Sequence, residues 1–210
     1  MNMWEAEGLY REKGYSLVCG CDEAGAGPLA GPVYAAAVIL PFGADIPGLN
    51  DSKQLTEKKR ETLFPVIRQT AMAWAVASVS AEEIDASDIL TARIKAMELA
   101  IGRLDPKADF ALIDGNRDHG KGASITLAHQ CVVKGDSLSA SIAAASILAK
   151  VSRDREMLDW DKTYPQYGFA QHKGYGTKAH YEALRQFGPC PIHRKTFLKT
   201  FDDGRGADDC

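Results

Sequence analysis

Hydrophobic residues recur along the chain in short runs that predict strands, and the first three runs follow one another closely. Residues 15–21 (YSLVCGC) form a short, partly β-branched run bounded by glycine, and residues 33–40 (VYAAAVIL) form a second run that ends before a proline. Residues 71–80 (AMAWAVASVS) alternate small and larger apolar side chains. Three successive strands with loops or a helix between them indicate a meander.

The hydrophobic period changes after the third run. Apolar residues then fall three or four positions apart, which predicts an amphipathic helix with Ser87 or Asp88 available as its N-cap. The apolar positions of this helix are Leu90, Ile94, Met97, Ile101 and Leu104.

Further strands and helices are predicted in the second half of the chain. Residues 109–114 (DFALID) form a short apolar run that ends in an acid, and residues 124–133 (SITLAHQCVV) form another strand candidate. Residues 139–160 are alanine-rich and favour a helix whose small side chains would let it pack close to a sheet. Residues 178–187 predict a last helix.

The order of these elements predicts an α/β fold that mixes antiparallel strands with strand–helix–strand units and ends in helices. No internal repeat, low-complexity linker or break in composition divides the chain, so residues 1–200 are expected to form a single domain. Residues 201–210 (FDDGRGADDC) are polar and acidic, which predicts a flexible tail.

Composition argues against a membrane protein. Hydrophobic residues make up 45% of the 210 positions, and no run approaches the roughly 18 consecutive apolar residues that a membrane span needs. The first sixteen residues (MNMWEAEGLYREKGYS) carry charges where a signal peptide has its apolar segment. We therefore expect a cytoplasmic protein with no membrane partner.

The net charge is unevenly distributed along the chain. It is −3 overall, yet residues 150–200 carry ten basic and five acidic side chains, a net charge of +5, which leaves −8 for the rest. A basic C-terminal third is compatible with a polyanion held on one side of the protein. Solvated helix faces carry such charge as well, so the gradient alone leaves both interpretations open.

Four acidic residues occupy positions at which α/β enzymes assemble their sites. Asp22 and Glu23 follow the first predicted strand, Asp114 ends a later one, and Asp136 comes just after a strand candidate. Clustered carboxylates repel one another unless a cation neutralises them, and Mg²⁺ prefers oxygen ligands. Two such ions about 3.5–4 Å apart can stabilise the attacking and the leaving oxygen of a phosphoryl displacement. The chain has no Walker loop, GxSxG or HExxH motif that would offer comparable chemistry.

The adjacency of Asp22 and Glu23 raises a geometric objection. Neighbouring residues of a strand point to opposite faces, so both can serve one site only if the chain leaves strand geometry there. Gly25 and Gly27 would provide the conformational freedom to do so. The residues by themselves leave open the alternative that the two acids are polar residues beside a tight turn.

Seven stretches of the chain, taken in order, resemble the signature blocks of bacterial ribonuclease HII. The resemblance extends over about residues 15–198, and seven blocks in the right order make it far more specific than any one of them. The blocks are CDEAGAGPLAGPV (21–33), GLNDSKQLTEKKRE (48–61), LIDGN (112–116), VVKGDS (132–137), SIAAASILAKVSRD (141–154), HKGYGT (172–177) and GPCPIHRKTF (188–197).

This resemblance implies both a fold and an activity. The fold is the ribonuclease H-like fold, a mixed five-stranded sheet flanked by helices, with a helical C-terminal part. The activity is endonucleolytic hydrolysis of RNA in RNA–DNA hybrids, including the phosphodiester 5′ of a single ribonucleotide embedded in duplex DNA. The implied cofactor is Mg²⁺ or Mn²⁺, with two ions in the substrate complex, and the implied products carry 3′-hydroxyl and 5′-phosphate ends.

The resemblance also assigns roles to individual residues. The family's catalytic metal ligands match Asp22, Glu23, Asp114 and Asp136. Its substrate-binding residues match Gly25, Ala26, Gly27, Ser52, Lys53 and Tyr175. Among these, the ring of Tyr175 would stack on the sugar that follows the ribonucleotide, and Ser52 and Lys53 would contact the substrate backbone. Recognition of a 2′-hydroxyl is what separates RNA from DNA at such a site.

One position departs from the family pattern. The family's turn reads Asp-Glu-Ala-Gly-Arg-Gly, and here Ala26 stands in place of the arginine. Gly25 and Gly27 preserve the backbone shape, so main-chain recognition of the ribonucleotide is expected to survive while one cation is lost. We expect intact metal chemistry with weaker binding or turnover than the family norm, unless an arginine from elsewhere compensates.

Two alternative functions remain open from the sequence. The protein could be a catalytically weakened nucleic-acid-binding variant, or another metal-dependent nuclease of the same fold. Asp154 lies between Arg153 and Arg155, and we expect an ion pair with these arginines on the long helix rather than a fifth metal ligand.

Overall fold

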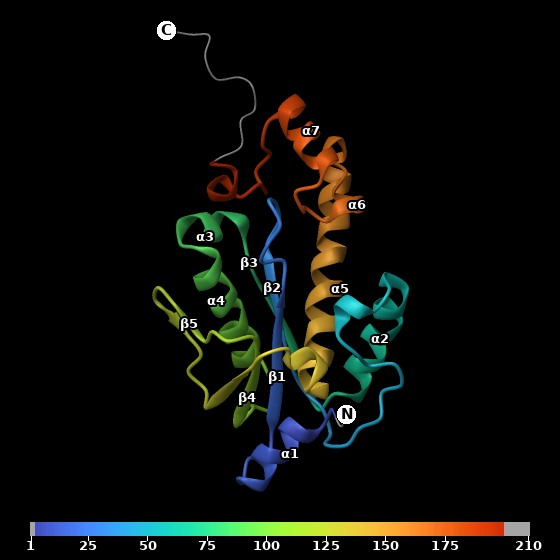
Figure 1. Cartoon of the computed structure of the whole chain (residues 1–210), viewed down its shortest axis with the longest axis vertical. Helices are drawn as coiled ribbons and strands as arrows, with labels where there is room; N and C mark the ends of the chain where they lie inside the picture. Colours follow the sequence, from blue (N-terminus) through green and yellow to red (C-terminus); the bar gives the residue numbers. More distant parts are fainter. Residues whose placement is uncertain (1–2, 200–210) are drawn as a thin grey trace.

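The centre of the protein is a mixed five-stranded sheet with helices on both faces (Figure 1). The computed structural model describes residues 3–199, so the tail predicted at residues 201–210 lies outside the described part. The strands lie in the order β3-β2-β1-β4-β7. Their bounds are β1 Val18–Ala24, β2 Val33–Ile39, β3 Ala73–Val79, β4 Phe110–Asp114 and β7 His129–Val132.

Strand directions explain why chemistry gathers at one edge of this sheet. β1, β2 and β3 pair antiparallel, which confirms the predicted meander, whereas β1, β4 and β7 pair parallel. Cys21 of β1 is in register with Ile113 of β4. The carboxyl ends of β1 and β4 therefore meet at the same edge, and the residues that follow this pair, Asp22 and Asp114, arrive there together.

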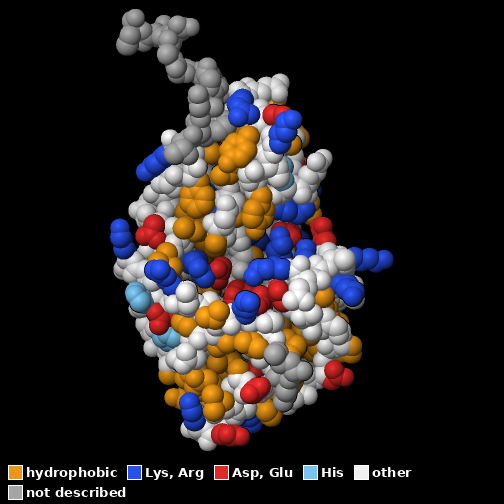
Figure 2. Space-filling model, in the orientation of Figure 1, with side chains coloured by type: hydrophobic (Ala, Val, Ile, Leu, Met, Phe, Trp, Pro, Cys, Tyr) orange, Lys and Arg blue, Asp and Glu red, His pale blue; other side chains and the backbone are white. Residues whose placement is uncertain are grey.

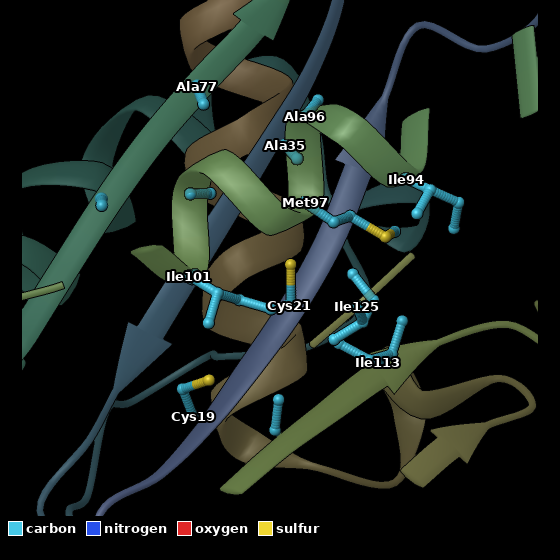
Figure 3. Packing of buried hydrophobic residues seen from close by; sticks show 14 of the residues in the cluster. Cys19, Cys21, Ala35, Ala77, Ile94, Ala96, Met97, Ile101, Ile113 and Ile125 are labelled. Atoms are coloured by element: carbon cyan, nitrogen blue, oxygen red, sulfur yellow. The ribbon is translucent and has the colours of Figure 1, made fainter. Parts of the chain in front are cut away.

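One face of the sheet is covered by α4 (Ile89–Gly102). Asp88 provides the N-cap by accepting a hydrogen bond from the N–H of Thr91. Alternate residues of β1, Cys19 and Cys21, point to this face and pack with apolar side chains of α4 such as Met97 (Figure 3). The predicted amphipathic helix is confirmed, and its apolar stripe forms half of this core layer.

The other face is covered by the long helix α5 (Ala140–Thr163), with α2 (Glu57–Thr70) packed beside it. A Cβ atom at Gly20 would collide with the backbone of Ser141 and Ile142, so α5 lies directly on β1. The alanine-rich sequence of α5 permits this close approach, as the sequence predicts. The helix begins at the N-cap Ser139, whose hydroxyl accepts the N–H of Ile142.

The C-terminal part packs at one end of the sheet, beside the carboxyl half of α5 (Figure 1). Its buried apolar residues include Phe169 and Leu184, which cluster with Leu29 and Ala30 of the loop that follows β1. The remaining helices and helical turns are α1 Glu5–Glu12, η1 Ser52–Gln54, α3 Ala81–Ala86, η2 Gly135–Ser137, η3 Pro165–Tyr167, α6 Phe169–His172, α7 Lys178–Phe187 and η4 Lys195–Leu198. Among residues 3–199, no helix has the length and apolar character to cross a membrane.

Two predicted strands have different bounds in the structure. The first was expected to end at Cys21, but β1 continues to Ala24 because its last residues pair with β2, Ala24 being opposite Tyr34. The strand expected over residues 124–133 is split. Ala123–Ser124 (β6) pairs with His119–Gly120 (β5) in a separate two-stranded ribbon, and only His129–Val132 joins the main sheet.

Candidate active site

Three of the four predicted acids converge at the carboxyl edge of the sheet. Asp22 comes from β1, Asp114 ends β4, and Asp136 lies in η2 just beyond β7. One carboxylate oxygen from each lies within 4.8 Å of the other two. Figure 2 shows acidic side chains gathered near the middle of this face of the molecule, with lysine and arginine side chains around them. The structure therefore brings these three strand-end acids together, as the parallel pairing of β1 and β4 predicts.

Main-chain hydrogen bonds fix two of these carboxylates. Asp22 Oδ1 accepts the N–H of Glu23 at 2.7 Å, and Asp114 Oδ1 accepts the N–H of Gly135 at 2.7 Å. The second bond ties the end of β4 to the turn that carries Asp136. Each carboxylate keeps its other oxygen for a further ligand.

Glu23 reaches the site from the opposite face of β1. The expectation that the chain leaves strand geometry at Asp22 and Glu23 is wrong, since both residues lie inside β1 and alternate as strand residues do. Glu23 Oε1 pairs with Arg93 Nη2 of α4 at 2.7 Å. Its other oxygen, Oε2, is buried and has no hydrogen-bond partner among residues 3–199. Sequence reasoning missed Arg93, because a polar residue within an amphipathic helix does not reveal which neighbour it will contact.

Burial and mutual repulsion make this acidic cluster costly without a cation. Burial, and then the charges of Glu23 and Asp114, raise the pKa of Asp22 well above its ordinary value. The pKa of Asp136 is raised by burial and by Asp114. Burial also raises the pKa of Glu23, and Arg93 opposes that rise. These three carboxyls bind protons more readily than exposed ones because burial and the repulsion between neighbouring negative charges disfavour the ionised form.

These residues fit a hard divalent cation. All the donors are carboxylate oxygens, which Mg²⁺ and Mn²⁺ prefer, and the buried Oε2 of Glu23 lacks any partner that the described protein could offer. A buried acceptor without a partner is rare in folded proteins, and a bound cation would satisfy it. The residues that would hold the ions are Asp22, Glu23, Asp114 and Asp136.

A cleft of 230 Å³ opens beside the acidic cluster. All six residues that the resemblance assigned to substrate binding line it, and so do three polar residues that the sequence did not single out. The first group is Gly25, Ala26, Gly27, Ser52, Lys53 and Tyr175, and the second is Arg60, Ser146 and Lys150. The missed residues lie on α2 and α5, whose periodicity does not reveal which polar side chains turn toward the cleft.

The predicted substrate contacts differ in how firmly they are held. Lys53 Nζ pairs with Asp136 Oδ2 at 3.3 Å, while its side chain is 77% exposed. Ser52 is buried, and its N–H donates to Ser146 Oγ of α5 at 3.3 Å. Tyr175 is 44% exposed, and its ring therefore presents a free face at the cleft.

The loop from Gly25 to Pro32 is held from behind by two buried arginines. Arg153 of α5 donates to the carbonyls of Ala30, Pro32 and Lys173 at 3.0–3.1 Å. Gly25 has φ +94°, and a Cβ atom at this position would collide with the Arg153 side chain, so no other residue type fits. Arg194 holds the other part of the loop, as described below.

The predicted ion pair of Asp154 with its neighbouring arginines is wrong. Asp154 pairs with Lys150 Nζ at 2.7 Å and more distantly with Arg60 Nη2 at 4.0 Å. Arg153 is buried on main-chain carbonyls, and Arg155 pairs with Glu61. The physical reason is helix geometry, because residues four apart share a face and adjacent residues do not.

Fold and site together define a ribonuclease H-like nuclease that depends on metal ions. The five-stranded mixed sheet carries the acidic cluster at the ends of its strands, and the cleft opens beside this cluster. A sequence profile of the family described as ribonuclease HII matches residues 19–200. The chain belongs to the ribonuclease HII family, whose members cleave RNA in RNA–DNA hybrids.

Individual relatives agree with this assignment. The chain is 53% identical over 201 residues to ribonuclease HII of Acetivibrio thermocellus, covering 96% of this chain and 76% of that protein. It is 54% identical over 202 residues to ribonuclease HII of Endomicrobium trichonymphae, covering 96% and 94%.

Solved structures share the fold. Ribonuclease HII of Archaeoglobus fulgidus, solved in complex with PCNA, matches with a TM-score of 0.73 at 27% identity, covering 91% of this chain and 98% of that one. Ribonuclease H2 of Pyrococcus horikoshii matches with a TM-score of 0.71 at 28% identity, covering 86% and 93%. The ribonuclease H-like fold expected from the sequence is confirmed.

Proposed function

We propose that this member of the ribonuclease HII family is an endonuclease that cuts 5′ of a single ribonucleotide embedded in duplex DNA, as well as within longer RNA–DNA hybrids. One observation carries the proposal: the acidic cluster opens directly onto a cleft that also contains the glycine loop and Tyr175. Phosphodiester chemistry and a means of recognising a sugar are thus side by side.

The acids would hold two Mg²⁺ or Mn²⁺ ions. When bound, such ions stabilise the charge on the attacking and leaving oxygens of a phosphodiester, which supports hydrolysis to 3′-hydroxyl and 5′-phosphate ends. Asp22, Asp114 and Asp136 offer oxygens on one side of β1, and Glu23 offers its unpartnered Oε2 from the other.

The other cleft residues would bind and orient the nucleic acid. The flexible, exposed side chain of Lys53 can pair with a phosphate once a cation takes over its contact with Asp136. The exposed ring of Tyr175 offers a flat apolar surface for a sugar. Gly25, Ala26 and Gly27 present main-chain groups to a ribose, whose 2′-hydroxyl can both donate and accept.

A nicking assay tests this function. Three duplexes are compared, one with a single ribonucleotide in DNA, one RNA–DNA hybrid and one of DNA alone, each with and without Mg²⁺ or Mn²⁺ and with mapping of the product ends. We expect metal-dependent cleavage of the first two and none of the third. Equal cleavage of the DNA duplex would instead identify another metal-dependent nuclease of this fold.

The neutral side chain of Ala26 keeps a second candidate in view, a protein that binds hybrids but cleaves them poorly. Tight binding of the single-ribonucleotide duplex without any metal-dependent nicking would favour it. The full set of four acids in the site argues for catalysis.

A further inference from the structure

Arg194 is a fully buried cation without an acidic partner. Its side chain has no solvent exposure, and no ion pair to it is found among residues 3–199. Its guanidinium instead donates to three main-chain carbonyls of the glycine loop. These are Gly25 O at 2.6 Å, Ala26 O at 2.9 Å and Gly31 O at 3.0 Å. A buried charge is tolerated only when it is fully hydrogen-bonded, and here the loop backbone supplies those bonds.

Because peptide groups are planar, these contacts also determine the direction of the N–H groups on the opposite side of the loop. In a trans peptide the N–H points opposite to the C=O of the preceding residue. Because the carbonyls of Gly25 and Ala26 point at Arg194, the N–H groups of Ala26 and Gly27 point away from it. On that side the same residues line the cleft. Neither N–H has an acceptor within the described part of the chain.

We propose that Arg194 is a positioning residue for substrate binding: it fixes two consecutive peptide planes so that the N–H groups of Ala26 and Gly27 face the nucleic acid, and its buried charge lies beneath residue 26, whose own side chain has none. The ligand it prepares for is an electron-rich oxygen of the nucleic acid backbone, on a phosphate or a ribose. This inference rests on the proposed function and explains how the loop works with alanine at position 26.

The hydrogen bonds to Arg194 also strengthen the donors on the other side of each peptide. An amide whose carbonyl accepts a bond from a charged donor becomes polarised, so its N–H donates more strongly. Two adjacent N–H groups with positive charge behind them form an anion-binding concavity of the kind that turns create. A guanidinium suits this task because its rigid, planar array of donors can hold two carbonyls at once, which an ammonium group cannot match.

The surroundings hold Arg194 in one place. Its own N–H donates to Leu29 O at 2.8 Å, and the N–H of Gly31 donates to Ile192 O at 2.9 Å, so the loop and the segment before η4 are joined by main-chain bonds. The preceding residue, His193, contacts His180 with their Nε2 atoms 3.0 Å apart. His180 in turn bonds Tyr175 O through its Nδ1 at 2.9 Å. The same buried network therefore positions Tyr175, whose ring lies beside Gly27 of the loop.

The variant Arg194→Lys tests the proposal, with Leu184→Ala as the matched control. Leu184 is fully buried in the same C-terminal cluster, but its apolar side chain makes no hydrogen bond to the loop. We expect Arg194→Lys to raise KM for the single-ribonucleotide duplex roughly tenfold, as expected when charged hydrogen bonds lose their geometry, with a smaller change in kcat. Mn²⁺ affinity, measured by calorimetry, should be unchanged. Leu184→Ala should lower the melting temperature without raising KM.

A merely structural role for Arg194 would give a different result. In that case Arg194→Lys and Leu184→Ala would lower the melting temperature and the activity in parallel, with no separation of KM from kcat, and the proposal would be overturned. If the wild-type protein does not cleave the duplex at all, the proposed function fails instead, so the two failures can be told apart.

Amide hydrogen exchange provides a second measurement that needs no change at Arg194. In the free protein the N–H groups of Ala26 and Gly27 should exchange rapidly, because they face the cleft without an acceptor. They should become protected when the single-ribonucleotide duplex binds to Asp114→Asn protein, in which cleavage is expected to stop. Protection already present in the free protein, or none in the complex, would contradict the proposal even if Arg194→Lys failed to fold.

Discussion

Two clusters of like charge are buried on either side of the glycine loop, and they are satisfied in opposite ways. At the sheet edge, Asp22, Asp114 and Asp136 converge within 4.8 Å, and nearby Glu23 keeps a buried oxygen without a partner. Behind the loop, Arg153 and Arg194 are also buried near each other, yet each donates to three main-chain carbonyls. The acidic cluster therefore has oxygen atoms left over to bind a cation, whereas the two arginines have their hydrogen bonds satisfied by the protein itself.

The pKa values follow this difference. Burial, together with Glu23 and Asp114, raises the pKa of Asp22 well above its ordinary value, so this carboxyl binds a proton more readily than an exposed aspartate does. Burial and the neighbouring Arg153 lower the pKa of Arg194 to about 9, which still leaves it charged at neutral pH. The acids, whose repulsion the protein does not neutralise, can bind a cation reversibly. The arginines, whose hydrogen bonds are all made within the protein, hold the glycine loop in one conformation.

The largest effect is expected from Asp114→Asn. The amide keeps an oxygen for the N–H of Gly135 but removes one charge from the metal site. We expect cleavage of the single-ribonucleotide duplex to fall by about a thousandfold or more, since metal-ion charge stabilisation is worth several kcal/mol. Stability without metal should rise slightly because like-charge repulsion is relieved.

The matched control for this variant is Asp159→Asn on the exposed face of α5, where Asp159 pairs with Lys162. It removes the same charge far from the acidic cluster and should leave kcat unchanged. Retained metal-dependent nicking in Asp114→Asn would show that this carboxylate is not needed for the chemistry.

Much of this arrangement could be predicted from the sequence, and the reason is topological. Asp22 and Asp114 were located by their position at the ends of apolar runs, and parallel pairing of β1 with β4 brings such ends together. The ribonuclease H-like fold followed from the ordered blocks. The resemblance also identified Ser52, Lys53 and Tyr175, which line the same cleft.

The sequence could not reveal how charges are paired or buried. Arg153 and Arg194 contributed to the basic C-terminal third, which suggested a surface for a polyanion, but both side chains are inside the protein. Nothing in a linear sequence distinguishes an arginine that binds phosphate from one that binds main-chain carbonyls. The contact between Glu23 and Arg93 depends on a helix that arrives from a different part of the chain.

Low pH should destabilise the C-terminal part of the protein, where His180 and His193 are buried behind the glycine loop. Burial lowers the pKa of His180 and of His193 to about 4, below the value near 6.5 of exposed histidine. Because the folded state binds these protons more weakly than the unfolded state, their contribution to stability is present above pH 6.5 and is lost as pH falls toward 4. We expect the folded protein to lose stability across this range as the two imidazoles become protonated.

The variant His180→Asn isolates this effect from the acidic cluster, whose raised pKa values act in the opposite direction. Asparagine can still donate to Tyr175 O but cannot titrate. The stability difference between wild type and variant, measured by urea unfolding, should therefore shrink between pH 7 and pH 4.5. A difference that stays constant over this range would show that His180 does not lose its neutral state in the way described.

Metal ions that bind the acidic cluster should stabilise the folded protein. A cation that binds only the folded protein adds about 2.7 kcal/mol at a concentration one hundred times its Kd. Thermal unfolding in the presence of Mn²⁺ should therefore shift to higher temperature in the wild type and much less in Asp114→Asn. An equal shift in both proteins would place the bound ion somewhere other than the acidic cluster.

The substitution Ala26→Arg probes the loop between the two clusters. If a charged contact to the substrate is missing at this position, arginine should improve kcat/KM on the single-ribonucleotide duplex by about 1–3 kcal/mol, roughly five- to 160-fold. The control Ala179→Arg adds the same charge on the exposed side of α7 and should change kcat/KM little. The measurement is steady-state kinetics, with kcat and KM resolved separately.

The outcome of Ala26→Arg also shows whether the buried charge of Arg194 replaces a cation at position 26 or only holds the shape of the loop. An improvement confined to KM would mean that the buried charge of Arg194 shapes the loop without replacing a surface cation, since a guanidinium enclosed by carbonyls cannot reach the substrate. No improvement in either constant would contradict the idea that a contact is missing. The polarised N–H groups of Ala26 and Gly27 would then supply the positive potential that the cleft needs beside its acids.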